Sequence, residues 1–361
     1  MEDNSIEYTT YTEKTLEPVL ALIRERFAEN DVAIVQRILE NPLRAERPAA
    51  GDVVLVGGKA VCFSAMLAKR AWLGSKSYEV SVGAFFSKSA AGCPPEYLLD
   101  VFDLVKSGGN QSDLMLGNTC IYRVAALARQ CGWASGPASW ETTRYAILKP
   151  LLFASLVAWR KLLKRPQPPA PDYRPPSPDA FFAKCGELEV HHDAMLDLPA
   201  LAAFWETYLA TNQGLVLSRT PAELKWLFEA DISKRKTVFL SLRRNKIIEG
   251  YIALHRLPDS PRRWRVYDLI ALDNNPERLE LLLKGAKNFL RRQAGAITLE
   301  ITGFPDRMQP LIRRLFPFKI QRGYNPYIWI ARRPETAECL RKAITSQEGW
   351  FFGPYDGEYC L

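Results

Sequence analysis

The sequence contains little that indicates metal binding, disulfide bonding or a membrane span. Its seven cysteines are odd in number and form no CxxC pair or zinc-ligand spacing, so we expect reduced thiols and no metal site. His191 and His192 are adjacent, so on a strand they would face opposite sides, and no Ser-His-Asp arrangement can be assembled. The uncharged stretch from Pro150 to Trp159 has ten residues, whereas a helix that crosses a bilayer needs about 20.

Residues 1–20 also lack the basic and then apolar pattern of a secretory signal and are acidic instead, so we expect a cytoplasmic protein. The net charge is +8, yet no recognised nucleic-acid motif accompanies it. The arginine pairs are scattered, which is typical of solvated faces; they lie at 243–244, 291–292, 313–314 and 332–333. We therefore expect no nucleic-acid partner.

What the sequence does contain is a change of composition near its middle. Residues 166–178 include seven prolines, which favour extended polyproline II structure and cannot continue a helix. A length of 361 residues fits two domains. We therefore predict two independently folded domains and a spacer, with boundaries at 1–150 (first domain), 151–178 (linker), 179–333 (second domain) and 334–361 (C-terminal aromatic tail).

The first part of the linker has two open interpretations. If residues 151–165 form a helix, Leu152, Leu156, Trp159 and Leu163 line one face, and basic residues gather at its end. Such a helix either packs on a domain or makes a weak contact with an anionic membrane surface.

The two flanking segments share one order of elements. Each opens with a strand and an amphipathic helix, continues with a hairpin, and then alternates strand, helix, strand, helix and a closing strand of its own. The distance from the hairpin turn to the end of the strand before the last helix is 61 residues in one half and 58 in the other. We predict the α/β class, with a mixed central sheet flanked by helices in each half.

This order resembles the GNAT (N-acetyltransferase) superfamily, here as two GNAT-like domains in tandem. The stretch "GNTCIYRVAALARQCGW" also resembles the superfamily's Asn, helix, Gly-aromatic signature, at Asn118, Gly132 and Trp133. The resemblance implies acetyl-CoA or another acyl-CoA as substrate, together with a small-molecule acyl acceptor. It implies that the acyl-CoA lies against a splayed pair of strands, with its pyrophosphate at the start of the next helix.

Neither half contains the superfamily's phosphate motif of Gln or Arg, two residues, Gly, one residue, and Gly or Ala. The corresponding turn of the first half is "SKSAAGCPP", whose small residues would let a phosphate approach backbone N–H groups at a helix start. A plain capped loop is the alternative. The predicted acyl-CoA residues are Ser87, Lys88, Ser89, Ala90, Ala91 and Gly92, with Asn118 either capping the next helix or contacting the pantetheine. In the second half, Asn274 or Asn275 before Pro276 indicates only a helix cap.

Acylation of an amine also needs a base that accepts the ammonium proton. Superfamily members often use a carboxylate on or near the fourth strand, and the corresponding candidates are Glu79 in "YEVSVG" and Asp268 in "VYDLIAL". A carboxylate in an apolar strand must be paired, hydrated or functional, because burying it uncompensated is costly. The tyrosine that commonly protonates the leaving group is replaced by Ala128 in one half and Arg313 in the other.

Three functions therefore stay open, of which the last is a membrane-surface adaptor built on the basic linker. The first is an acyl-CoA-dependent N-acyltransferase for a small amine or amino sugar, with one competent half and one supporting half. The second is a catalytically degenerate tandem GNAT-fold protein that binds a ligand or partner, which the missing motif and the missing tyrosine favour.

Overall fold

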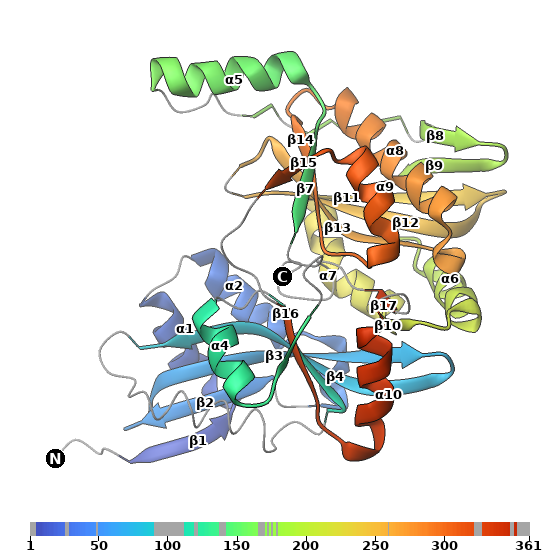
Figure 1. Cartoon of the computed structure of the whole chain (residues 1–361). Helices are drawn as coiled ribbons and strands as arrows, with labels where there is room; N and C mark the ends of the chain where they lie inside the picture. The colour runs from blue at the N-terminus through green and yellow to red at the C-terminus, as the bar shows by residue number, and fades with distance from the viewer. Residues whose placement is uncertain are drawn as a thin grey trace.

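The computed structural model of the chain contains two mixed β-sheets with helices packed on their faces (Figure 1). Among the described residues the first sheet has nine strands and the second has eight. The described residues are 5–25, 29–47, 50–89, 112–118, 122–136, 142–164, 170–171, 173–174, 176–177, 180–258, 260–320, 327–346 and 350–351.

The first sheet has the order β1-β2-β3-β4-β5-β16-β6, and β10 joins it by pairing with β3 and β17. Its strands bury side chains on both faces, because successive side chains point to opposite sides. In β3, Phe63 and Leu67 pack with helices α1 and α2, whereas Cys62 and Met66 pack with α4. The strands are β1 (Ile6–Thr10), β2 (Gly51–Val56), β3 (Lys59–Leu73), β4 (Lys76–Lys88), β5 (Leu114–Asn118), β6 (Ala134–Ser135), β10 (Leu215–Leu217), β16 (Tyr327–Ala331) and β17 (Trp350–Phe351).

The second sheet has the order β15-β7-β14-β13-β12-β11-β9-β8. On one face, α8 lies so close to β9 that a Cβ atom at Gly285 would stand 2.7 Å from Val190, so this position requires glycine. On the other face, Phe228 of α7 packs on Phe239 of β11. The strands are β7 (Thr143–Ile147), β8 (Phe181–Cys185), β9 (Leu188–Asp193), β11 (Thr237–Arg244), β12 (Ile247–Arg256), β13 (Arg263–Ala271), β14 (Thr298–Thr302) and β15 (Phe318–Ile320).

Helices α5 to α10 each have a proline in the first turn, where its missing N–H leaves no hydrogen bond unmade. No helix in the described part of the chain has the length and apolarity needed to cross a membrane. The helices are α1 (Leu16–Arg24), α2 (Glu29–Ile38), α4 (Tyr122–Gln130), α5 (Pro150–Leu163), α6 (Leu198–Thr211), α7 (Pro221–Ser233), α8 (Pro276–Arg292), α9 (Gln309–Leu315) and α10 (Pro334–Thr345).

The two sheets exchange their closing strands. β7, which follows α4 in the chain, lies in the second sheet and pairs antiparallel with β14, with Thr143 opposite Thr302. β16, which closes the second half of the sequence, lies in the first sheet and pairs with β5, with Tyr327 opposite Asn118. Figure 1 shows β7, in green, within the upper sheet and β16, in orange-red, within the lower one. The expectation that each half closes its own sheet is therefore wrong, because an apolar strand pattern does not specify which edge the strand joins.

Other contacts also join the halves. β10, from the second half of the sequence, pairs with the end of β3 in the first sheet. Arg37 of α2 donates hydrogen bonds to the carbonyl oxygens of Trp226 (2.5 Å) and Leu227 (2.6 Å) in α7. The indole N–H of Trp226 donates back to the carbonyl of Arg37 at 3.2 Å. Helix α7 thus packs against both halves (Figure 1).

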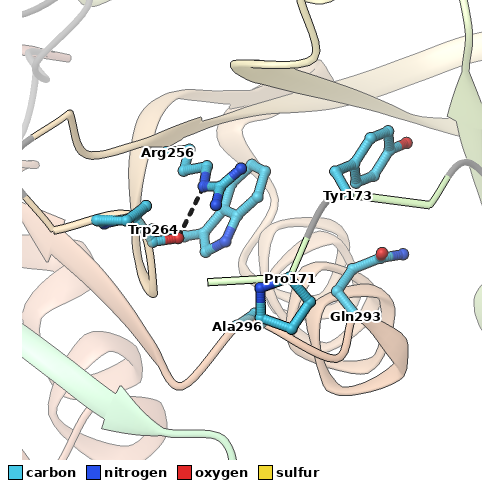
Figure 2. Close-up of a pocket in the computed structure, with 8 residues that line it drawn as sticks. Pro171, Tyr173, Arg256, Trp264, Gln293 and Ala296 are labelled. Atoms are coloured by element: carbon cyan, nitrogen blue, oxygen red, sulfur yellow. Dashed lines mark hydrogen bonds between the residues drawn. The ribbon is translucent and has the colours of Figure 1, made fainter. Parts of the chain in front are cut away.

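The described part of the proline-rich linker is anchored to the second half. Tyr173 is only 8% exposed, and its hydroxyl lies 2.8 Å from His192 Nε2. Figure 2 shows Pro171 and Tyr173 beside Trp264 at a shallow pocket that holds about 220 Å³ of empty space. A Cβ atom at Gly295 would lie 3.0 Å from the carbonyl oxygen of Pro171, so the linker approaches the backbone closely. At these residues the linker is not the free spacer that its composition predicts.

We expect the two halves to stay together when the linker is cut. A protease site inserted between Arg165 and Pro169 would sever the chain, yet the first fragment would still hold β7 of the second sheet and the second fragment would hold β10, β16 and β17 of the first. The cut protein should elute from gel filtration at the size of the intact chain, and its fragments should separate only in denaturant. Two folded fragments that elute separately would contradict the strand exchange and restore the expectation of independent domains.

Candidate functional site

In the first sheet, β4 and β5 separate part-way along their length. They form four parallel residue pairs, of which the last joins Gly83 to Gly117. The next residue, Ala84, is a β-bulge, an extra residue that β3 does not match. From there β4 continues to Lys88 and, among the described residues, pairs only with β3. We call residues 84–88 the β4 splay, because β4 continues through them beyond its last pair with β5.

The second sheet repeats this geometry. β13 and β14 form three parallel pairs, of which the last joins Arg265 to Glu300. Tyr267 is the extra residue of β13 at this point, and β13 then continues to Ala271. In both halves, therefore, one strand of a parallel pair carries a bulge and continues beyond the pairing, and the family resemblance implies such a splayed pair.

The predicted acyl-CoA residues begin within the β4 splay. Ser87 is 3% exposed, and its hydroxyl has no hydrogen-bond partner among the described residues. Lys88 is exposed, and Ser89 donates its backbone N–H to the carbonyl of Val61 at 2.9 Å. A buried polar group left without a partner costs about 1–3 kcal/mol, and the role of Ser87 in acyl-CoA binding stays a prediction. The other predicted residues lie outside the described residues and stay predictions: Ala90, Ala91, Gly92 and the side chain of Asn118.

The corresponding helix start in the second half is occupied by the protein itself. Asn275 Oδ1 accepts hydrogen bonds from the backbone N–H groups of Glu277 (2.8 Å) and Arg278 (3.2 Å), and Pro276 has no N–H to offer. Asp273 adds a negative charge 3.7 Å from Arg278. Two of the backbone N–H groups that a phosphate would bind at this helix start are already hydrogen-bonded to Asn275. This favours the prediction that the acyl-CoA site lies in the first half.

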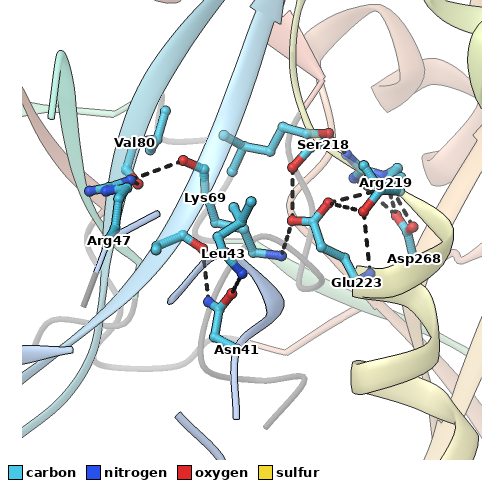
Figure 3. A network of polar contacts seen from close by, with 12 residues as sticks. Asn41, Leu43, Arg47, Lys69, Val80, Ser218, Arg219, Glu223 and Asp268 are labelled. Atoms are coloured by element: carbon cyan, nitrogen blue, oxygen red, sulfur yellow. Dashed lines mark hydrogen bonds and ion pairs between the residues drawn. The ribbon is translucent and has the colours of Figure 1, made fainter. Parts of the chain in front are cut away.

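Asp268, one residue after the bulge in β13, belongs to a buried ion pair. Its side chain and that of Arg219 are both 0% exposed, and the guanidinium donates to both carboxylate oxygens at 3.0–3.2 Å (Figure 3). The carboxylate also accepts the Tyr251 hydroxyl at 2.6 Å and the backbone N–H of Leu269 at 3.0 Å. The catalytic role predicted for Asp268 stays a prediction, but these donors surround the carboxylate and give a substrate no access.

A second buried ion pair continues this network into the first sheet. Lys69 of β3 lies 3.6 Å from Glu223 of α7, and both residues are 1% exposed. The Ser218 hydroxyl donates to Glu223 at 2.8 Å, and Ser218 is followed directly by Arg219. Figure 3 shows these residues in series between the two sheets. Since each buried charge is costly without its partner, the network fixes how the halves sit together.

Glu79, the other predicted base, lies on β4 just before the residues that pair with β5, 80–83. These paired residues separate it from the β4 splay. Its carboxylate is 3.3 Å from Arg47 and 3.4 Å from Arg70, and its side chain is 32% exposed. The structure therefore does not bring Glu79 together with the predicted acyl-CoA residues, and its role as base also stays a prediction.

Sequence reasoning missed a buried carboxylate that lies in register with the splay. Asp52 of β2 is opposite Ser64 of β3, and Ser64 is opposite Phe86 within the β4 splay. Asp52 is 8% exposed, and burial raises the pKa of its carboxyl from 3.8 to about 6, while the Arg332 guanidinium opposes this shift. The signal was present in the sequence, because Asp52 is the one charge in the apolar strand "GDVVLV".

The element order, the bulges and the splayed pairs define two GNAT-like acyltransferase folds in tandem, and known structures confirm this fold. A GCN5-related N-acetyltransferase from Kribbella flavida aligns with a TM-score of 0.54 and 12% identity, over 91% of this chain and 71% of that one. Another from Anabaena variabilis aligns with a TM-score of 0.54 and 14% identity, over 91% and 73%.

N-myristoyltransferase from Saccharomyces cerevisiae, solved with bound myristoyl-CoA, is also similar. It aligns with a TM-score of 0.52 and 14% identity, over 91% of this chain and 79% of that one. No protein-family model and no curated sequence matches the chain. At these identities the similarity establishes the fold, so activity has to be argued from the site.

Replacing Asp268 by Asn should strongly destabilise the protein, because Arg219 would remain buried without its counter-ion. Breaking a buried ion pair costs about 3–5 kcal/mol, which urea unfolding would show as a lower free energy of unfolding. Glu280→Gln is a matched control, because Glu280 pairs with exposed Lys284 and Arg314 and should lose only about 0–1 kcal/mol. If Asp268→Asn is as stable as the parent, Asp268 is not a structural group and its catalytic role gains support.

The raised pKa of Asp52 predicts that stability falls as pH rises. The folded state binds this proton more tightly than the unfolded state, so the free energy of unfolding should decrease between about pH 4 and pH 6, by roughly 1–3 kcal/mol in total. Asp52→Asn should therefore be more stable than the parent at pH 8 and equally stable at pH 4 in urea unfolding. Ser64→Ala keeps the carboxylate and should retain the parent's pH dependence. No gain at pH 8 would show that Asp52 ionises freely in the folded protein.

Proposed function

We propose that the chain is an acyl-CoA-dependent N-acyltransferase that acts on a small amine or amino sugar, with the first half as the competent one. The β4 splay carries the proposal, because β4 continues past its last pair with β5, which joins Gly83 to Gly117. Similarity in fold to a protein solved with bound myristoyl-CoA supports it. The cytoplasmic location expected from the sequence belongs to this proposal.

The β4 splay would suit the pantetheine arm of an acyl-CoA. That arm is an extended chain with two amide groups, which can hydrogen-bond to an open strand edge as an added strand does. The buried hydroxyl of Ser87 offers a further hydrogen bond in the same segment. The diphosphate would then fall at residues 87–92, where the side chains are small and Lys88 is positively charged.

In the proposed reaction, the amine nitrogen attacks the thioester carbonyl carbon, the carbon–sulfur bond breaks, and coenzyme A leaves as a thiolate that takes up a proton. The ammonium form of the acceptor must first lose a proton to a base. We propose Asp52, directly or through water, because its carboxyl lies in register with the splay and its pKa of about 6 is near neutral. Glu79 and Asp268 remain candidates, although each carboxylate is paired with an arginine.

A catalytically degenerate binding protein is the second candidate. The arginine contacts that hold both sequence-predicted carboxylates favour it, and so do Ala128 and Arg313 at the positions of the family's tyrosine. Such a protein would bind a ligand in the same splay without transferring the acyl group.

Calorimetric titration with acetyl-CoA and with coenzyme A tests the site. Gly92→Trp should abolish binding, because a bulky side chain would keep the diphosphate from the backbone. Asn275→Ala, at the matching helix start of the second half, should bind normally although loss of the cap costs about 1 kcal/mol of stability. Failure of the parent to bind either ligand, or loss of binding in Asn275→Ala alone, would contradict the assignment.

Release of the coenzyme A thiol in the presence of a panel of amines and amino sugars separates the two candidates. Asp52→Asn should lower kcat by about 100-fold or more while leaving acetyl-CoA affinity unchanged, as loss of a general base does. Acetyl-CoA binding without thiol release from the parent would favour the degenerate protein.

A further inference from the structure

Helix α5 contacts the rest of the protein along one side only. Leu156 is buried, at 7% exposed, and Leu152 and Phe153 beside it on the helix surface are half-buried. In Figure 1 the helix forms the outer margin of the molecule, beyond the second sheet. The body of the protein therefore covers only a narrow strip of α5.

The opposite side of α5 is apolar and uncovered by any described residue. Leu151 is 89% exposed and Leu162 is 79% exposed, although the solvent side of a surface helix normally carries polar residues. We call this the outer face of α5; its exposed apolar residues are Leu151, Ala154, Val157, Ala158, Trp159 and Leu162.

Positive charge borders this outer face. Lys161 and Lys164 are exposed at the C-terminal end of the helix, and the sequence has no acidic residue between Glu141 and Asp172. An apolar helix face bordered by lysines, with a tryptophan on it, is the pattern of helices that lie in the headgroup region of a membrane. With 14 residues α5 is about 21 Å long, shorter than the ~30 Å hydrocarbon core, so it could lie along a bilayer but not cross it.

We propose that α5 docks the protein on an anionic membrane surface. Leu151 and Leu162 would enter the boundary between headgroups and acyl chains, and Lys161 and Lys164 would contact lipid phosphates. A symmetric contact with a second copy of the chain explains the apolar residues but brings no negative charge to the lysines, since the helix itself contains none. This inference goes beyond the proposed acyl transfer and does not depend on it.

Vesicle flotation with the full chain tests the proposal. The protein should float with vesicles of phosphatidylcholine and phosphatidylglycerol, much less with phosphatidylcholine alone, and binding should weaken as salt is added. The double variant Leu151→Ser/Leu162→Ser should lose about tenfold or more in partition coefficient. Lys161→Glu/Lys164→Glu should lose a similar factor on the anionic vesicles. All four side chains are exposed, so circular dichroism should show both variants folded.

Two matched variants make the test specific. Met195→Ser/Ile247→Ser removes side chains that are 79% and 70% exposed elsewhere, and Lys59→Glu/Lys76→Glu makes the same change of net charge elsewhere. Both should bind vesicles as the parent does. The proposal is overturned if the parent does not bind anionic vesicles, or if the matched variants lose as much binding. It is also overturned if the parent does not bind vesicles and sedimentation shows that it self-associates, with the self-association lost in Leu151→Ser/Leu162→Ser.

Discussion

The pairing of β16 with β5 is the constraint on which the rest of the structure depends. β5 ends beside the splay, and its other edge is paired by a strand that arrives from more than two hundred residues further along the chain. The same strand brings Arg332 near Asp52, where the guanidinium opposes the rise in the carboxyl pKa. The candidate site of the first half is thus completed by the second half, and β7 makes the reciprocal contribution to the second sheet.

The buried ion pairs, like the exchanged strands, join the two halves. Lys69 and Glu223 join the first sheet to α7, and Arg219 and Asp268 join the loop before α7 to the second sheet. A buried ion pair adds little net stability over apolar residues of similar size, but a half-formed pair is costly, so such pairs penalise other arrangements of the halves. In the second half this chemistry occupies the place that corresponds to the β4 splay of the first.

Much of this fold follows from the sequence, since strand and helix periodicities, hairpin turns and first-turn prolines place most elements correctly. The partner of a strand does not follow from its own pattern, because "TRYAI" and "YIWIA" read as closing strands for either sheet. Arg219 could not be found either, because it follows a short strand in a polar-looking loop and its partner Asp268 lies 49 residues away in the sequence. Asp52 could have been found, by the same reasoning that singled out Asp268, as a charge within an apolar strand. Tyr173, the one aromatic residue of the proline-rich linker, was a comparable signal for its anchoring.

Amide hydrogen exchange in the native protein tests the strand exchange most directly. If the account is right, the amides of β16 and β5 exchange with the same opening free energy, and so do the amides of β7 and β14. Both opening free energies should equal the free energy of global unfolding, because neither sheet can open without losing a strand from the other half. The account is contradicted if the two sheets open with different free energies and β16 exchanges together with the second sheet while β7 exchanges together with the first.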